Sequence, residues 1–362
     1  MSKAAELAAL IGGQKALGDK NLIINGAMVV SQRATSSTGL GAADGYFTVD
    51  RMRMAIGDAS AGRFTMAQTA VTDLSGFSKS VKISCTTADT SIAAGERLVL
   101  NYRFEGQDLQ TLKSSASSTK GFTISFYARA NAAFNLCSEW IFGNGTNRQA
   151  NQINALTTDW QRFTMSIPAA TGTQVDDVTT HDTDLMFWMH AGSTYTTGST
   201  STTLRPNVTA NRAAGVSSIF ASTSNFVEIT GIQLEVGDVA TAFEHEDFGT
   251  TLAKCQRYYQ KSYNYSVVAG TATQVGATYS TTEASSNYPT AGFTSFPVKM
   301  RATPTITSYD YAGNSGKIRG GSDNVAVYIQ APGESGFGNY VNNVTVGAGA
   351  GVAIHYEAVS EL

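Results

Sequence analysis

Short runs of apolar residues, many alternating with polar ones, fill the chain from residue 21 to residue 237, and breaks rich in Gly, Ser, Asp and Asn separate them. The clearest runs are NLIINGAMVV, YFTVDRMRMAI, RFTMAQTAV, SVKISCTT, RLVLNYRFEG, GFTISFYARA, DWQRFTMSIP, DLMFWMHAG and NFVEITGIQLEVG. A period of two is typical of strands that bury one face. No helical pattern is interleaved with these runs, so residues 21–248 are predicted to form an all-β domain, an antiparallel jelly-roll sandwich.

A second set of β-type runs occupies the end of the chain: YNYSVVAGTATQV, PVKMRATPTITSYDY, NVAVYIQA and GVAIHYEAV. Gly- and Asn-rich turns separate them, which predicts a second, smaller β-sandwich domain over residues 263–362. Residues 168–212 are looser around one apolar run. They are predicted to form long surface loops of the first sandwich, where binding functions concentrate.

Helical spacing first appears at the N-terminus, where Leu7, Leu10 and Ile11 fall on one face of an alanine-rich segment that ends at Gly12-Gly13. A helix this short is marginal in water by itself. Residues 1–20 are therefore predicted to be a docking segment, held by a partner protein or by copies of the same chain.

A second helical pattern links the two domains. Leu252, Cys255 and Tyr259 share one helical face, and Thr250 is available as an N-cap. A connecting helix is therefore predicted over residues 249–262.

Composition narrows the classes of partner. Charged residues make up 15% of the 362-residue chain and the net charge is −3, which gives no basic stripe for nucleic acid. No stretch approaches the roughly 18 uninterrupted apolar residues of a membrane span, so membrane insertion is not expected. The cysteines are too few and too far apart for a disulfide framework or a zinc knuckle, which favours folding in a reducing cytosol: Cys85, Cys137 and Cys255.

Two acidic segments are the first candidates for chemistry. DDVTTHDTDLMFWMH gathers two histidines and four carboxylates, but its spacing matches no zinc or EF-hand motif, so neither metal nor cofactor is assigned; its members are Asp176, Asp177, His181, Asp182, Asp184 and His190. FEHED, which ends at Asp247, could supply an acid and a base. Acids also collect before a helix N-terminus because the helix dipole favours them there, so His245 is interpreted as part of a hinge.

Aromatic residues in loop-like segments are the candidates for ligand binding, because exposed rings stack on sugar faces and anchor interfaces. With one neighbouring carboxylate, the predicted ligand-binding set is Tyr195, Tyr309, Asp310, Tyr311, Phe337 and Tyr340. No nucleophile elbow, phosphate loop or dinucleotide fingerprint is present, so the chain is not expected to be an enzyme.

Several ordered landmarks carry a family resemblance: NLIINGAMVVSQRATS, GYFTVDRMRM, YRFEGQDLQTL, KGFTISFYARA, TDWQRFTMSIP and ITGIQLEVGDVATAFEHEDFGTTLAKCQRYYQK. Over residues 21–261 the chain resembles the carbohydrate-binding-module-like domain of bacteriophage tail fibres and related virion appendages. The resemblance implies a jelly roll whose first strand is the Asn21 segment and whose closing strand spans residues 229–236. Similar sugar-binding sandwiches often hold a structural calcium near these strands. Those modules carry an acidic residue where this chain has Asn25, Gly26 and Ala27, so no calcium is assigned here.

The resemblance also implies a role in the virion. Such appendages are usually homotrimers that attach to other virion proteins through the N-terminus, which suits Leu7, Leu10 and Ile11, and they face the host with the C-terminal domain. The expected function is that of a structural protein, synthesised in the host cytoplasm, that adsorbs the particle to a host surface glycan or receptor. Alternatives are a capsid decoration protein and a glycan-degrading tailspike using carboxylates such as Glu235, Glu244 or Asp247.

Overall fold

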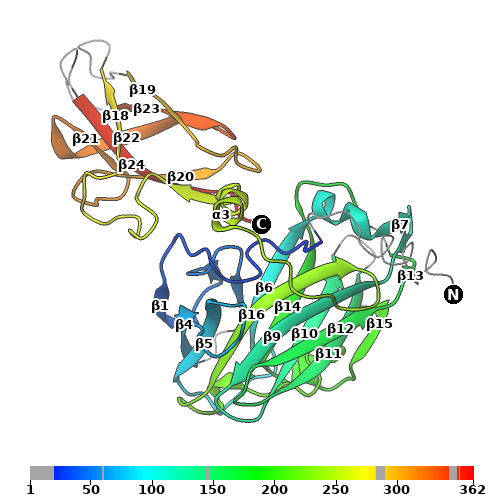
Figure 1. Ribbon diagram of the computed structural model, residues 1–362. Helices are drawn as coiled ribbons and strands as arrows, with labels where there is room; N and C mark the ends of the chain where they lie inside the picture. Colours follow the sequence, from blue (N-terminus) through cyan, green and yellow to red (C-terminus); the bar gives the residue numbers. More distant parts are fainter. Residues whose placement is uncertain are drawn as a thin grey trace.

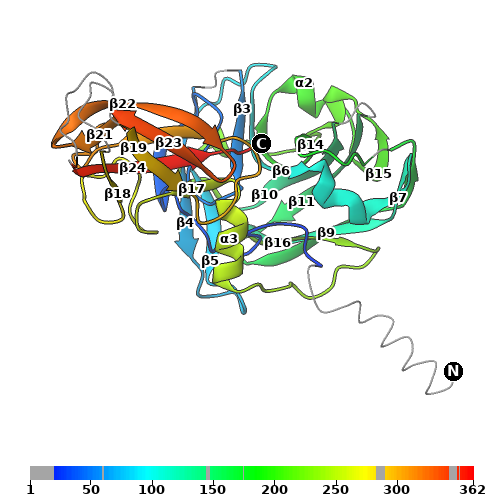
Figure 2. The ribbon, with the colours of Figure 1, turned by 90° about the horizontal axis from the view of Figure 1, so that it is seen from above.

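The computed structural model describes residues 20–58, 61–143, 147–173, 175–282, 290–341, 349 and 351–362, without the side chains of residues 290, 291 and 339–341. The predicted all-β class is confirmed, and the chain forms two β units with helix α3 between them (Figures 1 and 2). The predicted N-terminal helix, with Leu7, Leu10 and Ile11, lies outside the described residues.

The first unit is a sandwich of two antiparallel sheets. The six-stranded sheet has the order β1 (Ser36–Leu40), β4 (Arg63–Ala70), β5 (Lys79–Thr87), β16 (Phe226–Val236), β9 (Phe122–Ala130) and β12 (Gln161–Ile167). The seven-stranded sheet has the order β15 (Ser201–Pro206), β11 (Arg148–Leu156), β10 (Phe134–Phe142), β14 (His181–Ala191), β6 (Arg97–Glu105), β3 (Arg53–Gly57) and β2 (Gly45–Tyr46).

Smaller elements complete this unit. A three-stranded sheet has the order β13 (Ala170–Thr171), β8 (Ser118–Thr119) and β7 (Lys113–Ser115). One short helix, α2 (Ser193–Thr196), follows β14, and 3-10 turns span Gly106–Leu112, Thr209–Asn211 and Ile219–Ala221.

Alternation along the strands decides what each face of the seven-stranded sheet presents. On β6, Leu98, Leu100, Tyr102 and Phe104 join the core between the two sheets. The intervening residues, from Arg97 to Arg103, therefore lie on the outer face. The same period on β14 sends Leu185, Phe187 and Met189 into the core, which leaves Asp184, Met186 and Trp188 outside.

Two parts of the first unit differ from the expected strands. Residues 21–30 form no strand, although Leu22 N donates to Leu234 O and Ile232 N donates to Gly26 O, so this segment runs beside the closing strand β16. The run 46–56 is broken between β2 and β3, where Arg51 has φ of +70°. Strands β10 and β11 were not expected, because β10 is buried along most of its length and shows no alternation.

The link to the second unit is shorter than predicted. Helix α3 spans Phe248–Gln256, and its N-cap is Asp247 rather than Thr250, because the Asp247 carboxylate accepts a hydrogen bond from the Thr250 amide. The chain then enters strand β17 (Tyr259–Lys261), so the helix does not extend to residue 262.

The second unit is built around one connected antiparallel sheet. Its main path is β17, β24 (Gly351–Val359), β21 (Lys317–Gly320), β22 (Ser322–Gly333), β23 (Gly336–Val341) and β19 (Thr290–Ser295), and β18 (Thr278–Thr281) and β20 (Thr305–Tyr309) also pair with β24. Its core gathers Phe337 and Tyr356 with aliphatic residues such as Ile318 and Ile354.

Polar contacts dock the two units on each other. The buried Glu105 carboxylate of β6 accepts hydrogen bonds from the Arg257 guanidinium at 2.9 Å and from the Tyr258 hydroxyl at 2.6 Å. Arg51 of the first unit pairs with Glu361 of the second at 2.6 Å, with both side chains buried. The units are thus joined by more than the connecting helix.

Candidate functional site

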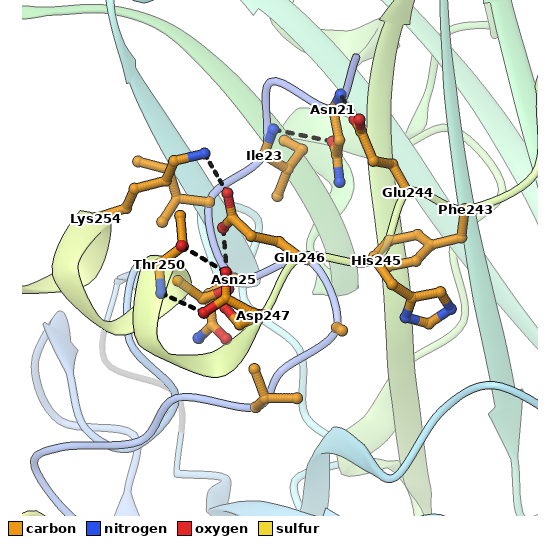
Figure 3. A pocket seen from close by; sticks show the side chains of 15 residues that line it. Asn21, Ile23, Asn25, Phe243, Glu244, His245, Glu246, Asp247, Thr250 and Lys254 are labelled. Carbon is orange, nitrogen blue, oxygen red and sulfur yellow. Dashed lines mark hydrogen bonds and ion pairs between the residues drawn. The ribbon is translucent and has the colours of Figure 1, made fainter. Parts of the chain in front are cut away.

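Among the described residues, two depressions in or beside the first unit are candidate sites. The larger, here called the junction pocket, has a volume of about 330 Å³ and is lined by residues 21–29, the turn 243–247 and helix α3 (Figure 3). The smaller, here called the sheet-face groove, has a volume of about 160 Å³ and lies on the outer face of the seven-stranded sheet.

The carboxylates of the junction pocket are engaged by neighbouring polar groups. Glu244 accepts a hydrogen bond from the backbone N–H of Asn21 at 2.7 Å, and Asp247 accepts one from the backbone N–H of Thr250 at 3.0 Å. Glu246 accepts one from the Thr251 hydroxyl at 3.0 Å and also pairs with Lys254. These contacts hold the chain where it leaves the sandwich, and they leave the acidic cluster with a structural task.

His245 takes no part in that acidic cluster. Its ring packs against Phe77 at 5.2 Å and Phe243 at 4.9 Å between ring centroids, and it points away from Glu246 and Asp247 (Figure 3). Glu235, the remaining carboxylate considered for hydrolysis, is buried and accepts hydrogen bonds from the Thr241 amide and hydroxyl.

The sheet-face groove is built by the register of three strands. Asn101 of β6 is paired with Arg53 of β3 on one side and Met186 of β14 on the other. The neighbouring row pairs Val99 with Ala55 and Trp188. With residues from two loops, the groove is lined by Asp44, Arg53, Ala55, Arg97, Val99, Asn101, Arg103, Asp184, Met186, Trp188 and Arg212.

Some of the buried polar atoms that lack a hydrogen bond gather in this groove. Among the described residues, the Asn101 Oδ1, the Asp184 Oδ1 and the Arg103 Nε make no hydrogen bond. Asn101 is 2% exposed and Asp184 is 8% exposed. Arg103 Nε lies 3.7 Å from Asp184 Oδ1, too far for a hydrogen bond. An unsatisfied buried polar group costs about 1–3 kcal/mol, so such a cluster points to a ligand-binding site.

A buried ion pair lies beside Trp188 and Met186, on the same outer face of the sheet as the groove. Glu139 is fully buried; it accepts hydrogen bonds from Trp188 Nε1 at 2.8 Å and Arg212 Nε at 3.1 Å. Burial raises the pKa of the Glu139 carboxyl, and the Arg212 guanidinium opposes that rise. Arg212 also lies 5.0 Å from the Trp188 ring centroid, which fixes the ring in place.

Tyr195 lies beside the groove, although not as the exposed loop ring that the sequence suggested. It belongs to α2, is 8% exposed and packs 5.2 Å from Trp188 between ring centroids. Its hydroxyl accepts a hydrogen bond from Arg97 Nη1 at 2.6 Å. Tyr195 thus supports a lining residue of the groove.

Two further predicted ligand residues are buried in the second unit, and the expectation of an exposed ring is wrong for Phe337. Phe337 is fully buried on β23 and belongs to the core. Asp310 is fully buried and accepts hydrogen bonds from three backbone amides, those of Ala312, Asn314 and Asn324. Phe337 is a core residue of its strand, and the Asp310 carboxylate closes a loop. Neither role can be recognised in a sequence segment that looks like a loop.

The remaining three predicted ligand residues do not share a site with the groove. Tyr309 is partly buried and donates to Glu357 at 2.7 Å, and Arg319 lies 5.3 Å from the Tyr311 ring centroid. Tyr340 lies on β23, and its side chain is outside the described residues. Ligand binding by these tyrosines stays a prediction.

The histidine-rich acidic segment divides between two environments. His181 pairs with Asp184 at 3.0 Å near the groove. His190 is fully buried, 3.1 Å from Glu96 and 2.8 Å from the Ser218 hydroxyl. In the part of the chain that the structure describes, no three ligand-type residues are grouped closely enough to hold a metal ion.

The sequence did not reveal the groove, because RLVLNYR predicts a strand and does not say what covers its polar face. The signal was present in its alternate positions: Arg97, Asn101 and Arg103 are polar residues on one face of a strand whose other face is apolar. If this face of the strand were open to water, the Asn101 side chain would be exposed, but it is buried.

No family model and no curated protein matches the chain. Among solved structures it is similar to a CBM4 module, with 13% identity over 59% of this chain and 98% of that one and a TM-score of 0.30. A family 11 carbohydrate-binding module of a Clostridium thermocellum cellulase has 10% identity over 59% and 99%, with a TM-score of 0.28. The enzymatically active domain of tailspike protein 4 of bacteriophage CBA120 has 7% identity over 60% and 22%, with a TM-score of 0.28.

Proposed function

We propose that this chain is a phage virion structural protein, a tail fibre or short appendage, and that its jelly-roll unit binds a host surface glycan in the sheet-face groove. This proposal places the contact with the glycan in the first unit, whereas the sequence predicted that contact in the C-terminal domain. The proposal rests on the Asn101 Oδ1, which makes no hydrogen bond, and on the Asp184 carboxylate, which forms ion pairs with Arg103 and His181 and whose Oδ1 makes no hydrogen bond. Sugar hydroxyls both donate and accept hydrogen bonds, so they match two buried acceptors beside the Arg103 guanidinium.

The floor of the groove suits the rest of a sugar. Ala55 and Met186 are the partly exposed apolar residues beside Asn101, whereas Val99 and Trp188 are buried. Binding sites commonly combine such apolar surface with a few convergent polar groups. In this proposal the protein binds the glycan and does not cleave it. The carboxylates of the junction pocket accept hydrogen bonds that stabilise the fold.

The virion setting completes the proposal. The family resemblance of residues 21–261 favours an appendage, and residues 1–20 would attach it to tail or capsid proteins. A homotrimer would present three grooves, so that avidity strengthens weak single-site binding. Native mass measurement should give three times the mass of one chain, and antibody labelling of purified particles should decorate their surface.

The groove is tested by Asn101→Leu, which replaces the amide with an apolar group of similar size. Binding to host surface polysaccharide, measured by titration calorimetry, should fall at least tenfold. Thermal stability should stay equal or rise, because an unsatisfied buried group is removed. Gln161→Leu, on the exposed strand β12 of the other sheet, is the matched control. Undiminished glycan binding by Asn101→Leu would rule out this groove.

A further inference from the structure

Four arginines line the sheet-face groove: Arg53, Arg97, Arg103 and Arg212. Three of them face a carboxylate, and these carboxylates are respectively Asp44, Asp184 and Glu139. The fourth, Arg97, has no carboxylate within ion-pair distance among the described residues. The groove therefore contains one guanidinium whose charge is not balanced locally.

Arg97 is positioned although it is not neutralised. Its Nη1 donates to the Tyr195 hydroxyl at 2.6 Å, and the Tyr195 ring is held against Trp188. Gly57 lies opposite Arg97 on β3, and a Cβ at Gly57 would come within 2.7 Å of the Arg97 Cζ. The glycine thus leaves the space that the guanidinium occupies, and a neutral phenol fixes one edge of it.

Strand β6 sets the distance between the Arg97 guanidinium and the Asn101 amide oxygen. Arg97 and Asn101 lie four residues apart on one face of β6, which corresponds to roughly 13 Å along an extended strand. Val99 lies between them on the same face. A short oligosaccharide lying along β6 could therefore meet Arg97 at one end while its hydroxyls meet Asn101 and Asp184 at the other.

We infer that the groove selects an acidic oligosaccharide, with the carboxylate of one sugar bound by Arg97 and hydroxyls of a more distant sugar bound by Asn101 and Asp184. This inference rests on the proposed glycan-binding function. A planar guanidinium suits a planar carboxylate, and hydrogen bonds between charged partners are about twice as strong as neutral ones. The chain as a whole carries a net charge of −3, so its overall charge does not favour acidic ligands and the preference arises at Arg97.

The test compares each member of a panel of uronic-acid oligosaccharides with its carboxyl-reduced, neutral counterpart, using the full chain and titration calorimetry. At least one acidic member should bind about 10- to 100-fold more tightly than its neutral partner, as expected for a charge-assisted hydrogen bond. Arg97→Gln should bring the two affinities to within about threefold. Arg162→Gln, on exposed β12, is the control and should keep the difference.

This experiment separates failure of the acidic specificity from failure of the glycan-binding site. If no acidic member binds better than its neutral counterpart, the acidic specificity is wrong; retained binding of neutral members would still support the glycan site. If Arg97→Gln keeps the full preference, the carboxylate is bound elsewhere and the assignment to Arg97 is overturned. Thermal unfolding of both variants distinguishes loss of the site from loss of the fold.

Discussion

Asp182 shows how one residue makes the stability of the fold depend on pH. It lies at the start of β14 and is 4% exposed. Burial raises the pKa of its carboxyl to about 6, although a hydrogen bond from the Thr183 hydroxyl at 3.2 Å opposes that rise. Because the folded state holds the proton more tightly than the unfolded state, the free energy of unfolding falls as pH rises from about 4 to about 6.

Asp182→Asn removes this titration. The variant should be more stable than the parent at pH 8, on the order of 1 kcal/mol because nearby water screens part of the cost, and the gain should disappear near pH 4. Urea unfolding at both pH values measures it. Asp177→Asn, at an exposed position, should show no such pH dependence. An equal gain at both pH values would mean that Asp182 is not the titrating group.

At the scale of single elements, α3 depends on its N-cap. Asp247 accepts a hydrogen bond from the Thr250 amide at 3.0 Å and one from the Thr250 hydroxyl at 2.5 Å. Asp247→Ala should therefore lower the free energy of unfolding, measured by chemical denaturation, because the helix loses its capping hydrogen bond. Asp247→Asn keeps a capping oxygen and should lose much less. Equal losses in both variants would show that the charge of Asp247, not its hydrogen bond, stabilises the helix.

Element by element, the alternating pattern predicted strands that bury one face, such as β4, β5 and β12. It failed where burial is two-sided, as on β10, and where residues 21–30 follow β16 without forming a strand. The cap was misplaced because Asp247 and Thr250 are both good cap residues three positions apart. The groove depends on the register of β3, β6 and β14, strands far apart in sequence, which local patterns do not specify.

Across the whole molecule, the docking of the two units depends on a buried carboxylate. Glu361 accepts from Arg51 at 2.6 Å and from Arg33 at 3.1 Å, and its side chain is 6% exposed. Arg51 also stacks 3.5 Å from the Tyr258 ring centroid, at the end of the connecting segment. One acidic side chain of the second unit thus compensates two guanidinium groups of the first.

Glu361→Gln leaves the buried Arg51 without its anion and leaves Arg33 with Asp50 alone, so it should destabilise the docked state by about 3–5 kcal/mol. Arg33→Gln should cost less, because Glu361 keeps Arg51, the more deeply buried of the two partners. Scanning calorimetry should show one transition for the parent chain and two for Glu361→Gln, as the units unfold separately. A single, unshifted transition in Glu361→Gln would show that the hydrogen bonds of Glu105 to Arg257 and Tyr258 are sufficient to couple the units.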